Sequence, residues 1–135
     1  MSARRFLDTN ILIYAFAKDD PRSATAEQLL AEGGVIGIQV LNEFANVSRR
    51  KLALGWDEIA KRIEVVKALV DPPAPLTQDI HDAARALAQA RKIEFHDALI
   101  VAAAQAARCE VLLTEDLQAG ARFGSLEIRN PFAAP

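Results

Sequence analysis

Short apolar segments alternate with longer segments of helical periodicity along this chain, and this alternation limits the folds open to it. Strands are expected at residues 4–8, 35–38, 110–114 and 126–128. Helices are expected at residues 9–17, 24–32, 39–54, 57–70, 77–92 and 97–108, with a helical turn at 117–121. Strands separated by helices pair in parallel, in a sheet covered on both faces. The pattern predicts an α/β/α sandwich with a central, mainly parallel sheet.

The domain organisation follows from the length of the chain. Its 135 residues suit one domain with one core. The proline-rich stretch at residues 71–75 is interpreted as a loop, because the part that follows is too short to hold a core of its own. We therefore expect a single domain over residues 1–135.

Composition excludes several classes of protein. A net charge of −2 argues against holding nucleic acid by bulk charge alone, although it permits a local basic groove. The single cysteine, Cys109, rules out an intramolecular disulfide and suits a reducing cytoplasm. No apolar run approaches the length of a membrane span. Arg4, Arg5 and the apolar run after them loosely resemble a signal peptide, but Asp8 interrupts the approach to that run. We expect a cytoplasmic protein with no membrane contact.

Two acidic residues follow predicted strands. The segment "FLDTN" places Asp8 where the first predicted strand stops, and "LLTED" places Thr114 and Asp116 where the late strand stops. In open parallel sheets, ligands bind at the carboxyl ends of the strands. Burying a carboxylate beside an apolar run is costly unless something pairs with it. Both acids are thus predicted at the edge of the sheet where a ligand would lie.

Two further acids border apolar helices. Asp97 opens the apolar segment "DALIVAAAQAAR", where the helix dipole alone would favour a carboxylate. Glu43 borders the stripe of Val40, Phe44 and Val47, where it could also simply pair with a nearby basic side chain in solvent. His96 precedes Asp97 and is expected to be a bystander. Neither His96 nor His81 has a partner at zinc-ligand spacing.

Taken together, the four acids favour a cation site. Converging carboxylates repel one another, and a cation would neutralise them. Oxygen ligands without paired cysteine or histidine suit Mg²⁺ or Mn²⁺. A carboxylate site of this kind can cleave phosphodiester bonds without a protein nucleophile. The chain has no convincing Ser-His-Asp or Cys-His set and no glycine-rich phosphate loop.

The segments "FLDTNILIYAF", "LNEFANV", "HDALIVAAA" and "LLTEDL" together resemble the PIN-domain family, and more narrowly the VapC-like toxins of type II toxin–antitoxin pairs. The resemblance covers about residues 4–132. It implies an acidic pocket that binds Mg²⁺ or Mn²⁺ and cleaves RNA, formed by Asp8, Glu43, Asp97 and Asp116. Thr9, Asn10 and Thr114 resemble its supporting residues. Asn46, one helical turn from Glu43, is predicted from spacing alone to support the site.

The resemblance also implies partners. It predicts a homodimer and a small cognate antitoxin that covers the pocket, often with an arginine reaching the acids. RNA could be held by the basic runs that begin at Arg4, Arg49 and Arg91, although each could equally be a solvated face. One tryptophan and one tyrosine give little support to base stacking, so recognition of RNA by shape is expected.

Three other functions stay open at this point. An aspartyl-nucleophile phosphohydrolase usually has a second acid two residues after the first, where this chain has Asn10. A receiver-type module would have a lysine closing a late strand, whereas "EVLLTED" ends in acids. A non-catalytic, binding PIN-like domain is disfavoured by the four acids but not ruled out by them.

Overall fold

The computed structural model describes residues 3–133 and confirms the expected alternation of strands and helices. In chain order the elements are β1 (Arg5–Leu7), α1 (Thr9–Ala15), α2 (Ser23–Glu32), α3 (Ile38–Arg50), α4 (Trp56–Leu69), α5 (Gln78–Arg91), α6 (Phe95–Ala106), β2 (Val111–Leu113), β3 (Arg122–Phe123) and β4 (Leu126–Arg129). None of the helices in this part of the chain is long and apolar enough to cross a membrane.

The four strands form one sheet in the order β1-β2-β4-β3. β1, β2 and β4 are parallel, with Leu7 opposite Leu113 and Leu113 opposite Arg129, and β3 is antiparallel to β4. The prediction of a mainly parallel sheet is confirmed. Because β1 and β2 run in the same direction, their carboxyl ends lie at the same edge, and Asp8 and Thr114 directly follow them.

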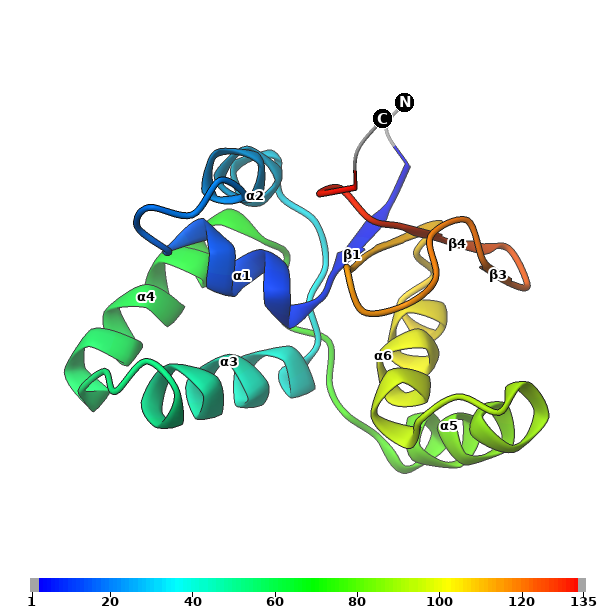
Figure 1. Cartoon of the computed structure of the whole chain (residues 1–135). Helices are drawn as coiled ribbons and strands as arrows, with labels where there is room; N and C mark the ends of the chain where they lie inside the picture. Colours follow the sequence, from blue (N-terminus) through cyan, green and yellow to red (C-terminus); the bar gives the residue numbers. More distant parts are fainter. Residues whose placement is uncertain (1–2, 134–135) are drawn as a thin grey trace.

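Helices cover the sheet from two sides. In Figure 1, α1 to α4 gather to one side of β1, and α5 and α6 lie on the other. The core contains fully buried residues from three adjacent strands, among them Phe6, Leu112 and Ile128. α6 presents buried alanines such as Ala98 and Ala104. The architecture is the predicted α/β/α sandwich.

The region expected to be a strand at residues 35–38 is shorter than predicted. It makes two single bridges, Val35 with Phe6 and Gly37 with Ala74. The backbone N–H of Ile38 donates to the Ala74 carbonyl, and α3 begins at that residue. The chain therefore turns away from β1 after one paired residue, which is why no strand extends here.

Three other predictions need correction. Residues 117–121 do not form a helical turn: residue 117 lies in a bend and residues 119–120 in a turn, with Gly120 at a positive φ of 85°. α6 begins at Phe95, so Asp97 is the third residue of the helix and does not open it. On α3 the buried stripe is Val40, Phe44 and Ser48, since Val47 is only half-buried.

Candidate active site

Asp8 lies at the junction of β1 and α1, where it is the N-cap residue of α1. Its Oδ1 accepts a hydrogen bond from the Thr9 backbone N–H at 2.7 Å, and its Oδ2 accepts one from the Thr114 hydroxyl at 2.8 Å. The residue is only 6 % exposed. Burial raises the pKa of Asp8 to about 6, and the negative charges of Glu43 and Asp116 add to that rise, against the lowering effect of the two hydrogen bonds. Asp8 is thus a buried acid beside other acids.

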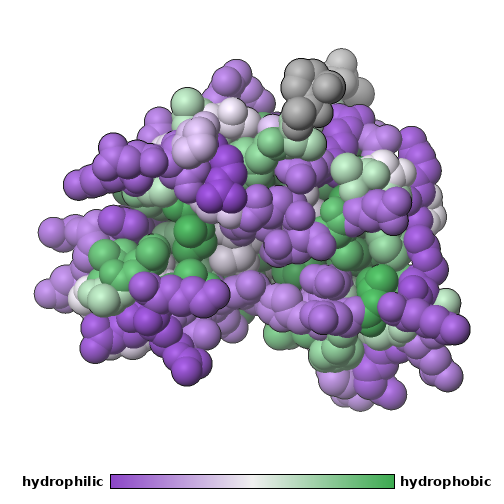
Figure 2. Space-filling view, viewed as in Figure 1, coloured by the Kyte–Doolittle hydropathy of each residue, from purple (hydrophilic) through white to green (hydrophobic). Residues whose placement is uncertain are grey.

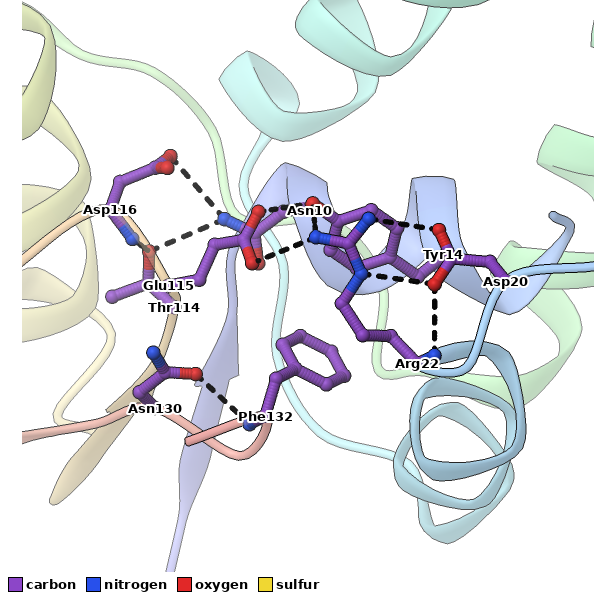
Figure 3. Close-up of polar contacts among 9 residues, drawn as sticks. All are labelled: Asn10, Tyr14, Asp20, Arg22, Thr114, Glu115, Asp116, Asn130 and Phe132. Carbon is purple, nitrogen blue, oxygen red and sulfur yellow. Dashed lines mark hydrogen bonds and ion pairs between the residues drawn. The ribbon is translucent and has the colours of Figure 1, made fainter. Parts of the chain in front are cut away.

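Asn10 and Thr114 both contact Asp116 (Figure 3), and Thr114 also contacts Asp8. The Asn10 side-chain amide lies 3.3 Å from Asp116 Oδ2 and 3.4 Å from Thr114 Oγ1. Thr114 Oγ1 also accepts from the Asp116 backbone N–H at 3.0 Å. Asn10 and Thr114 therefore link two of the acids through their side chains. Thr9 contacts Asp8 only through its backbone N–H, and its hydroxyl has no hydrogen-bond partner among residues 3–133.

Asp97 lies in the first turn of α6, and Glu43 lies on α3. Burial raises the pKa of Asp97, and the charges of Asp116 and Glu43 contribute to the rise. The negative charges of Glu43 and Asp116 likewise raise the pKa of Asp8. The four acids therefore influence one another electrostatically, although they come from four separate elements or loops.

The residues present fit a hard divalent cation by their chemistry. The acidic donors offer only oxygen, which suits Mg²⁺ or Mn²⁺. Two side-chain oxygens beside Asp8, Thr9 Oγ1 and Asn10 Oδ1, are buried and have no hydrogen-bond partner among residues 3–133. Within those residues, however, no three Asp, Glu, His or Cys side chains are close enough to form a ready metal-binding group. The acids share a region and an electrostatic field, but they do not form a closed set of ligands.

His96 contacts Glu43, which the sequence did not predict. Its Nε2 lies 2.8 Å from Glu43 Oε2, and its Nδ1 lies 3.5 Å from Gln39 Nε2. His96 and Glu43 are 53 positions apart, and the only hint in the sequence was that His96 adjoins Asp97. The predicted supporting residue on α3, Asn46, is exposed and makes no hydrogen bond through its side chain within the described part of the chain.

A second network that the sequence did not reveal holds the loop after β2 against α1 (Figure 3). The Tyr14 hydroxyl hydrogen-bonds to Glu115, and Arg22 reaches both the Tyr14 hydroxyl at 2.7 Å and Glu115 Oε2 at 3.4 Å. The Arg22 guanidinium stacks 3.7 Å from the centre of the Tyr14 ring and also pairs with Asp20. Since Tyr14 follows Asn10 by one helical turn, both residues hold the loop that carries Asp116.

The three basic runs differ in what they contact. Arg4 pairs with Asp71 and Arg5 with Glu32, at the amino end of β1 and therefore away from Asp8. Arg91 donates to the Arg122 carbonyl and stacks on Phe123. Arg50 and Lys51, at the end of α3, form no ion pair within residues 3–133. Figure 2 shows a largely hydrophilic surface over the region between the two groups of helices.

Comparison with solved structures identifies proteins of the same fold. A toxin–antitoxin complex from Klebsiella pneumoniae has a chain that is 24 % identical, with a TM-score of 0.71, covering 98 % of this chain and 100 % of that one. VapC20 from Mycobacterium tuberculosis, described as a sarcin-ricin loop cleaving toxin, is 21 % identical, with a TM-score of 0.64 and coverage of 80 % and 86 %. FitAcB from Neisseria gonorrhoeae is 20 % identical, with a TM-score of 0.66 and coverage of 96 % and 99 %.

These identities are low enough that the likeness concerns the fold alone. Comparison with curated protein sequences gives no match. The sequence itself, however, matches the family model of the PIN domain over residues 5–121, a span that contains all four acids. On that match, and with the fold in agreement, the chain belongs to the PIN domain family.

Proposed function

We propose that this chain is a Mg²⁺- or Mn²⁺-dependent endoribonuclease that acts as the toxin of a toxin–antitoxin pair. The observation that carries the proposal is the burial of Asp8 among other acids at the carboxyl ends of β1 and β2. A buried carboxylate with like charges around it is costly without a cation. The family membership and the likeness in fold to VapC20 support the same activity.

The residues that would hold the ion are Asp8, Glu43, Asp97 and Asp116. A divalent ion held by these residues would supply charge stabilisation at the phosphate and would lower the pKa of a bound water. The chain's own residues orient the ligands. Thr114 and the Thr9 backbone fix both oxygens of Asp8, and Asn10 holds Asp116.

The direct test is cleavage of total bacterial RNA by the purified protein, measured on denaturing gels. Cleavage should occur with Mg²⁺ or Mn²⁺ and stop when EDTA is added. Asp8→Asn and Asp97→Asn should each slow it by about 100-fold or more, as expected when several kcal/mol of charge stabilisation are lost. Circular dichroism would show that both variants stay folded.

Asp82→Asn is the matched control, because Asp82 is an exposed carboxylate of α5 whose one ion pair among residues 3–133 is with Arg85 at the surface. It should cleave RNA like the unmodified chain. Cleavage that persists in both Asp8→Asn and Asp97→Asn would end the proposal. Absence of cleavage by the unmodified chain would favour a binding domain, and covalent labelling of Asp8 by a phosphoryl donor would favour an aspartyl-nucleophile enzyme.

The proposed partners are a small cognate antitoxin and a second copy of this chain. We propose that the chain is a single domain and that it acts in the cytoplasm. Support comes from the solved complexes of similar fold, one of which is described as a toxin–antitoxin complex. Expression of the chain alone should arrest bacterial growth, and co-expression of a cognate antitoxin, to be sought among short reading frames beside its gene, should restore it. A mass from light scattering equal to one chain would contradict the homodimer.

A further inference from the structure

The Glu43 carboxylate is held from one side only. Among residues 3–133, His96 is its single hydrogen-bond partner, at 2.8 Å from Oε2. Glu43 is about one-third exposed, with 29 % of its side chain accessible, so solvent and neighbouring charges would otherwise leave it mobile. The contact joins α3 to the first turn of α6, the two helices that carry Glu43 and Asp97.

Gln39 adds a third residue to this hydrogen-bond network. It precedes Glu43 by one turn of α3, and its Nε2 lies 3.5 Å from His96 Nδ1, at the outer limit of a hydrogen bond. Its Oε1 is buried and has no partner among the described residues. A Gln39 amide that donates to Nδ1 requires the ring proton of His96 on Nε2, from which it would be donated to Glu43.

We propose that His96, backed by Gln39, is a positioning residue that holds Glu43 by Oε2 and leaves Oε1 available to bind the divalent cation. This inference rests on the proposed metal-dependent function. Ligating carboxylates work best when a neighbouring donor fixes their orientation, and loss of such a neighbour typically weakens metal binding by about 10–100-fold. His96 itself does not touch the ion or the RNA in this scheme.

The test is a calorimetric titration of Mn²⁺ into metal-free protein at one fixed pH. His96→Ala should weaken Mn²⁺ binding by about tenfold or more. His96→Gln should recover most of that loss, because a glutamine amide can still donate to Glu43. His81→Ala is the matched control: His81 lies beside α6 through an edge contact with Phe95, but it does not reach Glu43.

The outcomes separate the two proposals. If the unmodified chain does not bind Mn²⁺, or if Asp8→Asn binds it equally well, the proposed function fails. If the unmodified chain binds and Asp8→Asn does not, while His96→Ala binds as tightly as the unmodified chain or more tightly, only the positioning role fails. Thermal unfolding of each variant would separate a loss of fold from a loss of binding.

A second measurement addresses the geometry directly. Nitrogen-15 NMR spectra of the imidazoles at pH 8 should show His96 with its proton on Nε2. Gln39→Leu should shift His96 towards a mixture of tautomers, because no donor then faces Nδ1. An Nδ1-protonated His96 in the unmodified chain would overturn the proposed chain of hydrogen bonds.

Discussion

An ionised Asp8 carboxylate lowers the free energy of unfolding when no cation is bound beside it. The folded protein holds the proton of Asp8 more tightly than the unfolded chain does, because its pKa rises from 3.8 to about 6. Between about pH 4 and pH 6 the native state therefore binds more protons, so the free energy of unfolding falls as pH rises. Below about pH 4 the penalty is absent, and above about pH 6 it is fully present.

Asp8→Asn should remove this penalty. In EDTA at pH 7.5 the variant is expected to be more stable than the unmodified chain by up to about 3 kcal/mol, the equivalent of a shift of roughly two pKa units. At pH 4 the difference should shrink towards zero. Urea unfolding at both pH values measures it. A variant that is less stable at pH 7.5 would mean that the hydrogen bonds of Asp8 outweigh its burial.

At the scale of elements, the network of Tyr14, Arg22 and Glu115 fixes the loop after β2. Tyr14→Phe keeps the ring and its edge contact with Phe132 but removes the hydroxyl. We expect a loss of about 1 kcal/mol in the free energy of unfolding. Amide exchange over residues 114–118 should become faster, while exchange in α5 stays unchanged. Unchanged exchange in the loop would show that Asn10 alone is enough to hold it.

Position 34, where the backbone lies against β1, requires glycine. Its φ is +147°, and a Cβ there would lie 3.0 Å from the Arg5 carbonyl oxygen. Gly34→Ala should cost about 1–3 kcal/mol through backbone strain, measured by urea unfolding. Gly55→Ala is the control, because nothing lies within 4 Å of its Cβ position and its φ is −71°. Equal stability of the two variants would contradict this account.

The long helices could be predicted from the sequence, and the short pairings could not. Apolar periodicity over 14 residues locates α4 to within one residue at each end. β3 has only two residues, and its partner β4 is reached through the turn at Gly124, so no alternating pattern marks it. Val35 pairs for one residue because the hydrogen bond of Ile38 to Ala74 redirects the chain.

The acids were identifiable because each is a charge beside an apolar segment. Asn10 and Thr114, which contact Asp8 and Asp116, were also predicted from the resemblance, whereas other long-range contacts could not be predicted. His96 meets Glu43 across 53 positions, and Arg22 meets Glu115 across 93, so only the packing of helices against the sheet brings them together. Asn46 illustrates the converse, since helical spacing placed it near Glu43 but the structure leaves it exposed.

At the scale of the whole molecule, cation binding should couple to global stability. A ligand that binds only the folded chain stabilises it by about 2.7 kcal/mol at a concentration 100 times its Kd. Mg²⁺ should therefore raise the unfolding temperature of the unmodified chain by several degrees and leave that of Asp8→Asn unchanged. Differential scanning calorimetry with Mg²⁺ or EDTA would measure this. An equal rise in both proteins would place the ion elsewhere.

Both edges of the sheet expose few unpaired backbone N–H and C=O groups. On one margin β3 is two residues long, and on the other Val35 exchanges hydrogen bonds with Arg5 and Leu7 while residues 71–74 cover its outer side. Exposed strand margins recruit strands from other molecules and seed fibres. A chain with these edges should therefore resist strand-to-strand aggregation even at high concentration.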